Sequence, residues 1–186
     1  MNDRDVFNHV TNSREDILQE FLDTLHKNQI PFCVIGGLAV NAYAEPVVSL
    51  DLDLVIITAW LEDLVAILEE RFTVTRFPHS VNVSSPHSDL RIQLQTDVRY
   101  QPFVARAEPK TILGYELSVA ALEDVLTGKV WAFSDPERRP SKRQKDLADI
   151  MRLVETYPRL LSSLSQSLQE RVKAESNFTE FTEDKE

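Results

Sequence analysis

Two aspartates stand two residues apart in a run of aliphatic side chains, Leu50-Asp51-Leu-Asp53-Leu-Val-Ile-Ile57. Apolar and β-branched residues of this kind predict a buried strand over about residues 50–57. Because side chains alternate across a strand, Asp51 and Asp53 share one face and lie close together. Two such carboxylates repel each other, and each is costly to bury in apolar surroundings. A divalent cation relieves both costs, so the spacing predicts a site for Mg²⁺, or for Mn²⁺ in its place.

A pair of glycines lies upstream, between a predicted strand and a predicted helix. Residues 32–35 are apolar and predict a buried strand, and residues 38–44 predict a short helix. Without β-carbons, Gly36 and Gly37 let the backbone and its N–H groups approach a phosphate closely. A phosphate site beside metal-binding carboxylates is the machinery for in-line displacement at a nucleotide phosphate. The alternative for the glycine pair is a tight turn that binds no ligand, and the alternative for the two aspartates is a solvated strand edge.

The combination of Gly36-Gly37, a short helix and Asp51-x-Asp53 resembles the nucleotidyltransferase superfamily that includes DNA polymerase β. Within it, the chain looks most similar to small bacterial abortive-infection toxins. The resemblance covers about residues 14–157. It implies that Asp51 and Asp53 hold the metal and serve catalysis, and that the glycine pair holds the triphosphate.

Two further segments carry the resemblance downstream. Residues 129–132, Lys-Val-Trp-Ala, resemble a Lys-x-x-Ala helix of those toxins, and residues 143–149 resemble their basic Lys-Asp-x-x-Asp helix. By this resemblance Lys129 and Lys145 contact phosphates or the acceptor. Each role has a purely structural alternative. Lys129 could extend to the surface. The basic cluster at 138–145 could be the solvated face of a helix capped by Ser141.

Two positions depart from the superfamily pattern. Its members usually carry a third carboxylate on a later strand, as metal ligand and general base, and here that position is Gln93. A glutamine amide donates and accepts hydrogen bonds but takes no proton at neutral pH. Asp89 and Asp97 are alternatives, although Asp97 would lie about 13 Å beyond Gln93 along an extended strand. Relatives also tend to have a basic residue where this chain has Ser49-Leu50.

The overall composition is that of an ordinary globular protein of 186 residues with a net charge of −10. This charge argues against non-specific DNA binding, which needs a basic face. The chain has no apolar run of about 18 residues that would span a membrane, and its N-terminus does not resemble a secretory signal. Its single cysteine, Cys33, lies in an apolar run and is expected to be buried. We therefore expect a cytoplasmic protein.

Hydrophobic periodicity predicts the remaining elements. Helices are expected from about Ser13, the candidate N-cap, to before Pro31, and at 59–71, 119–133, 141–156 and 158–173. Strands at 72–77, 81–84 and 90–95 suggest a mostly antiparallel meander, and a hairpin near 108–118 is expected to turn at Gly114. The fold class is therefore α+β, a mixed sheet flanked by helices with a helical C-terminal segment. We expect a nucleotidyltransferase-like domain at 1–157, followed by a helix and an acidic tail at 158–186.

Three functions remain open at this point. The first is Mg²⁺-dependent transfer of a nucleoside monophosphate from an NTP to a hydroxyl on a protein, an RNA end or a small molecule. The second is a catalytically weak or inactive relative that binds nucleotide as a regulator, and its motivation is Gln93. The third is an interaction module, such as half of a toxin–antitoxin pair, that uses its acidic surface.

Overall fold

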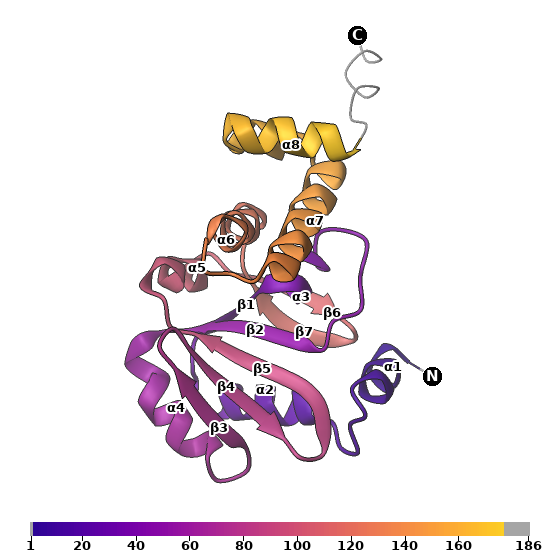
Figure 1. Ribbon diagram of the computed structural model, residues 1–186. Helices are drawn as coiled ribbons and strands as arrows, with labels where there is room; N and C mark the ends of the chain where they lie inside the picture. The colour runs from indigo at the N-terminus through magenta and orange to yellow at the C-terminus, as the bar shows by residue number, and fades with distance from the viewer. Residues whose placement is uncertain (1, 177–186) are drawn as a thin grey trace.

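The computed structural model describes residues 2–176 (Figure 1). A mixed seven-stranded sheet forms the centre, and helices cover it. The helices are α1 (Asp3–Val10), α2 (Ile17–Lys27), α3 (Gly36–Val40), α4 (Leu61–Leu68), α5 (Gln101–Ala105), α6 (Leu122–Ser134), α7 (Pro140–Thr156) and α8 (Gln166–Ser176), with short 3₁₀ turns at Thr58–Trp60, Val98–Tyr100 and Pro158–Ser163. The strands are β1 (Phe32–Ile35), β2 (Asp51–Ile56), β3 (Thr73–Phe77), β4 (Ser80–Ser85), β5 (Ser88–Gln95), β6 (Glu108–Ile112) and β7 (Tyr115–Val119).

The strands lie in the order β3-β4-β5-β2-β1-β7-β6. Strands β3, β4 and β5 form the expected antiparallel meander, and β6 and β7 form the expected hairpin around Gly114. Two pairings are parallel, β2 with β5 and β1 with β7. The sheet is therefore mixed, as expected, and β2 lies at its middle with strands on both sides.

Side chains along β2 point alternately to the core and to the opposite face of the sheet. Leu52, Leu54 and Ile56 are buried on one face of the strand. Asp51 and Asp53 occupy the opposite face, as the sequence predicts. Figure 1 shows α2 and α4 on the side of the strands β3, β4 and β5 that lies away from α6 and α7.

Several element boundaries differ from the sequence predictions. Helix α2 is capped by Asp16, whose side chain accepts a hydrogen bond from Gln19 N, whereas the hydroxyl of Ser13 bonds Ser88. Helix α7 begins at Pro140, so Ser141 is not its cap. Proline at the first helical position is favoured because its missing N–H would be unpaired there anyway.

The C-terminal segment also differs in detail. The helix expected at 158–173 is divided into a 3₁₀ turn, Pro158–Ser163, and α8, Gln166–Ser176. Leucines from both pieces are buried against the rest of the molecule. Residues 177–186 of the expected acidic tail lie outside the described residues. Within 2–176, none of the helices is long and apolar enough to span a membrane.

Candidate active site

Strand β2 places its two aspartates beside three neighbouring elements. In the register of the sheet, Asp53 lies opposite Ile35 of β1 and opposite Gln93 of β5. Asp51 lies opposite Arg91 of the same strand β5. Because β1 runs directly into the glycine pair, this register brings Gly36 to the side chain of Asp53. The two sequence motifs, separated by thirteen residues of chain, thus meet at one place.

The two glycines have different environments. Gly36 has a φ of +70°, and a β-carbon built on it would lie 2.1 Å from Oδ2 of Asp53. Only glycine fits there, because the backbone is left-handed and packs directly on the carboxylate. At Gly37 a β-carbon would meet only Ser49 Oγ at 3.8 Å and Lys145 Nζ at 3.9 Å. Gly36 therefore positions Asp53, and Gly37 faces the open side of the site.

A cavity of about 270 Å³ opens in front of the aspartates. Its lining combines sheet, α3, α6 and α7, and the residues are Gly37, Ser49, Asp51, Asp53, Asn82, Arg91, Ile92, Gln93, Lys129, Arg138, Lys142, Lys145 and Asp146. Five of these are cationic and three are carboxylates, so their formal charge is 5 − 3 = +2. In a chain whose net charge is −10, this local excess of positive charge favours an anionic ligand.

A second cavity of about 90 Å³ adjoins the first. The two share Asp53, Gln93, Lys129, Arg138 and Asp146. Aromatic side chains close its other end. They include Tyr100 and Phe103, and both rings also contact Trp131. Burial raises the pKa of the Tyr100 hydroxyl to about 12. These rings form an apolar wall at the end of the cavity that also contains Asp53.

The two aspartates differ in their partners. Asp51 Oδ1 lies 2.7 Å from Arg91 Nε, and its Oδ2 lies 3.6 Å from Lys142 Nζ. The side chain of Asp53 forms no hydrogen bond or direct ion pair with any residue in 2–176. Burial raises the pKa of the Asp53 carboxyl, and the neighbouring charge of Asp51 adds to this shift, whereas Lys129, Arg138 and Lys145 oppose it. Asp53 thus has cations nearby but no direct partner among the described residues.

Lys129 lies in a buried network of charges, at the edge of both cavities. Its Nζ is 2.6 Å from Asp149 Oδ2 and 3.3 Å from Asp146 Oδ1, and its side chain is only 8% exposed. Arg138 also bonds Asp146, and Arg152 bonds Asp149. Asp146 and Asp149 are therefore partners of neighbouring basic residues. Lys129 points to the cleft rather than to the surface.

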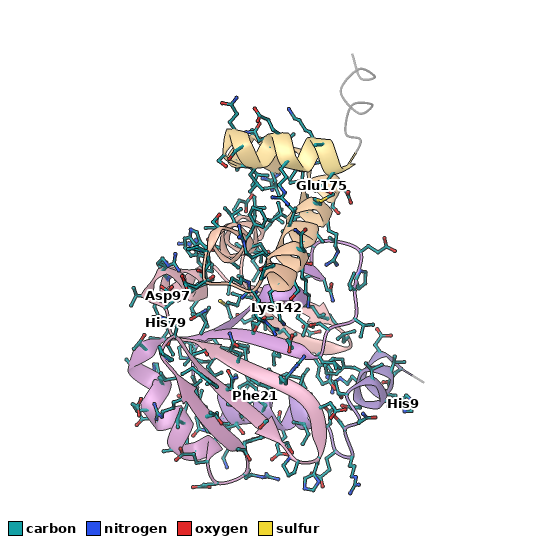
Figure 2. All side chains as sticks on the ribbon, viewed as in Figure 1. His9, Phe21, His79, Asp97, Lys142 and Glu175 are labelled. Atoms are coloured by element: carbon teal, nitrogen blue, oxygen red, sulfur yellow. The ribbon has the colours of Figure 1, made fainter. Side chains whose placement is uncertain are left out.

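The position expected for a third carboxylate holds Gln93. Its neighbours in sequence do not replace it. Asp97 binds Arg99, and Asp89 accepts a hydrogen bond from Asn12. Figure 2 shows Asp97 beside His79 at the end of the sheet, whereas Lys142 lies over its middle strands. Within residues 2–176, no group of three or more His, Cys, Asp or Glu side chains could hold a metal ion.

The basic cluster at 138–145 divides between the cavity and a contact with α6. Lys142, Lys145 and Arg138 line the larger cavity. Arg143 instead donates a hydrogen bond to the carbonyl oxygen of Phe133 and so joins α7 to α6. Helix geometry explains the division, because residues three apart on α7 share a face.

Sequence reasoning missed two residues of the site, Asn82 and Arg91. Each lies on a strand whose alternation was recognised, and each is on the same face as Gln93 or directly opposite it. The alternation in β5 was a usable signal for Arg91. Nothing in the sequence sets the register that brings Asn82 of β4 into the site.

A comparison with protein-family models identifies the family. A family model described as nucleotidyl transferase AbiEii toxin, type IV toxin–antitoxin system, matches residues 16–185. No curated protein sequence matches this chain.

Three solved structures share the fold. A nucleotidyltransferase-like protein from Paracoccidioides brasiliensis has a TM-score of 0.54 and 18% identity, over 93% of this chain and 89% of that one. ANT(2″)-Ia in complex with adenylyl-2″-tobramycin has a TM-score of 0.53 and 18% identity, over 86% and 94%. Lincomycin-bound LnuA, a lincosamide antibiotic adenylyltransferase, has a TM-score of 0.52 and 12% identity, over 76% and 99%. With most of its length matched by the family model, the chain belongs to the AbiEii nucleotidyltransferase toxin family.

Proposed function

We propose that this protein transfers a nucleoside monophosphate from an NTP to an acceptor hydroxyl, with Mg²⁺ held by Asp51 and Asp53. The observation that carries the proposal is the cavity in which two carboxylates, Gly37 and five cationic side chains converge. Nucleotidyl transfer needs a charged triphosphate to be held in line with the attacking hydroxyl. A cavity with net positive charge around a metal-binding carboxylate pair suits that requirement.

The residues fit a divalent cation. Mg²⁺ commonly takes one or two carboxylates and completes its shell with water and substrate phosphates. The Asp53 side chain has no direct ion-pair partner within 2–176, and burial raises its pKa although nearby lysine and arginine charges oppose the shift. Asp51 forms an ion pair with Arg91, whose side chain is 67% exposed. Such a surface ion pair is weak, so a metal ion could displace Arg91 from Asp51. When bound, the metal would neutralise phosphate charge and polarise the reacting phosphoryl group.

The other residues bind and orient the nucleotide. Lys145 and the backbone of Gly37 lie on the same side of the cavity and would hold the phosphates. Lys142 and Arg138 add positive charge to this wall. The aromatic wall of the smaller cavity would limit the access of water to the reacting centre. Gln93 would hydrogen-bond rather than accept the proton of the acceptor hydroxyl.

A second candidate function follows from Gln93. An amide in place of a third carboxylate favours a protein that binds nucleotide but transfers it slowly. Gln93→Asp separates the two candidates. A large rise in transfer from an α-labelled NTP would favour the weak or regulatory function, whereas unchanged transfer would remove its main support.

Calorimetric titration of the four NTPs, with and without Mg²⁺, tests the proposal. Wild-type protein is compared with Asp51→Asn/Asp53→Asn and with Asp89→Asn/Asp97→Asn, which removes the same charge outside the cavity. We expect Mg²⁺-dependent binding that only the first double variant loses. Absence of binding by the wild type, or equal loss in both variants, would refute the proposal.

Growth assays extend the test to the cell. Because the family is one of toxins, we expect induced wild-type protein to arrest growth of a bacterial host. Asp51→Asn/Asp53→Asn should not arrest growth at the same protein level. Arrest by the double variant would point to an interaction rather than to nucleotidyl transfer.

A further inference from the structure

The larger cavity has two chemically different walls. One is cationic and comes from α6, α7 and the segment between them, with Lys129, Arg138, Lys142 and Lys145. The other comes from β4 and β5 and presents two uncharged amides, Asn82 and Gln93. Figure 1 shows these walls on opposite sides, since α6 and α7 lie above β1 and β2 whereas β4 lies beyond β5. The carboxylates of β2 stand between them.

The two amides form a pair. Asn82 and Gln93 are directly opposite each other in the antiparallel register of β4 and β5, and Gln93 is opposite Asp53 on β2. Opposed side chains in such a pair have β-carbons about 5 Å apart. Three polar side chains therefore form one row across three strands, ending at the unpaired carboxylate.

Neither side-chain amide is hydrogen-bonded to another residue within 2–176. The side-chain oxygen of Asn82 is buried and has no hydrogen-bond partner within residues 2–176. Gln93 likewise forms no side-chain hydrogen bond there, in contrast to Gln95, whose oxygen accepts from the backbone N–H groups of Thr96 and Asp97. An unpaired amide group next to a cavity is free to bond a ligand there. Both side chains line the larger cavity, so a ligand in it would meet the amide atoms that face the open space.

The chemistry of this wall selects its ligand. Each amide offers an acceptor and two donors but no charge, which matches hydroxyl groups. In-line transfer needs the attacking hydroxyl opposite the leaving pyrophosphate. If the cationic wall holds the pyrophosphate, the acceptor lies against the amides. We propose that Asn82 and Gln93 bind the acceptor through an uncharged vicinal diol, as on a ribose or a pyranose.

This inference rests on the proposed function and sharpens it. Of the cavity's cations within 2–176, only Arg91 comes from β4 or β5, and it is paired with Asp51. The amide wall offers no free carboxylate to a cationic acceptor. With Asp51 and Asp53 holding the metal, and Asp146 paired with Lys129 and Arg138, the site should discriminate against polyamines and aminoglycosides, because their ammonium groups would be desolvated without a free counter-charge.

Nuclear magnetic resonance of the side-chain amides tests the inference. The donor site is first filled with α,β-methylene-ATP and Mg²⁺. The ¹⁵N-labelled protein is then titrated with adenosine, 2′-deoxyadenosine, methyl glucoside or tobramycin. Loss of a signal in Asn82→Leu or Gln93→Met assigns each amide. Thr75→Val is the matched control, because Thr75 lies opposite Asn82 on β3 but does not line the cavity.

We expect adenosine or methyl glucoside to shift the Asn82 and Gln93 signals, and whichever binds identifies the sugar. The deoxynucleoside and tobramycin should bind at least tenfold more weakly. Each amide variant should weaken diol binding about three- to tenfold, and Thr75→Val should not. Donor binding without any diol response in the wild-type protein would overturn this inference alone. Failure of the ATP analogue to bind would overturn the proposed function and this inference with it.

Discussion

Replacing Gly36 by alanine tests whether the glycine pair exists to position Asp53. Gly36 combines a φ of +70° with direct contact to a carboxylate. Its missing β-carbon would lie 2.1 Å from Asp53 Oδ2 and 2.9 Å from Asp53 Cγ. Since β1 and β2 hold both residues in a central sheet, neither can move away easily. Gly36→Ala should therefore displace the Asp53 side chain and destabilise the protein.

Two costs contribute to the loss of stability expected for Gly36→Ala. A left-handed conformation costs a residue with a β-carbon about 1–2 kcal/mol. Overpacking at a closely packed position costs about 1–3 kcal/mol. The expected loss in the free energy of unfolding is thus about 2–5 kcal/mol, which lowers the Tm of a chain of this size by roughly 4–20 °C. Gly37→Ala is the matched control, because its β-carbon would have no contact closer than 3.8 Å.

Urea denaturation followed by tryptophan fluorescence measures both variants, since Trp60 and Trp131 report on different parts of the chain. Gly37→Ala should be at least as stable as the wild type, because alanine in a helix is favoured over glycine by about 0.5–1 kcal/mol. Adding Asp53→Ala to Gly36→Ala should recover the overpacking cost but not the backbone cost. Equal stability of Gly36→Ala and Gly37→Ala, or no coupling with position 53, would refute the reasoning.

Three further predictions concern the charges of the site. Without metal, Asp53→Asn should stabilise the protein at pH 7, because burial raises the pKa of this carboxyl in the fold. The raised pKa makes the wild type less stable as pH rises. The stability difference between variant and wild type, measured by urea titration, should therefore vanish below about pH 4. Lys129→Met should lower the free energy of unfolding by about 1–3 kcal/mol, since the buried Asp146 and Asp149 keep only their arginine partners; unchanged stability would contradict the network. Arg91→Gln should tighten Mn²⁺ binding, measured by paramagnetic resonance, by roughly two- to fivefold, because the exposed ion pair that competes with the metal is weak; weaker Mn²⁺ binding would show that Arg91 assists the metal site.

Local patterns were sufficient for much of the fold. The aliphatic run at β2, the hairpin at Gly114 and the helical periodicity of α2 were all readable because each depends on near neighbours in the chain. Helix α1 was missed, although Asn2 and Asp5 form a capping box there. Its short length and single buried residue, Phe7, left little periodicity to detect.

Pairings between distant strands were beyond local patterns. Strands β2 and β5 are both apolar on one face, and that pattern suits a parallel or an antiparallel neighbour equally. A long connection joins β2 to β5. The direction in which β5 returns along β2 depends on how α4 and the meander within this connection pack. The same limit applies to the site. The sequence predicted that Asp51 and Asp53 share a face, but the partners Arg91 and Asn82 depend on a register that only the folded sheet sets.

The asymmetry between the two aspartates links the fold to the proposed chemistry. The protein supplies Asp51 with an arginine that is exposed and easily displaced, and it leaves Asp53 without a partner among the described residues. Gly36 packs directly against that carboxylate, and Tyr100 lines the smaller cavity beside it. Because burial raises the pKa of Asp53, the ionised carboxylate makes the empty protein less stable. A cation held by Asp51 and Asp53, as proposed, would offset that cost, so metal binding should both stabilise the fold and lower the pKa of Asp53.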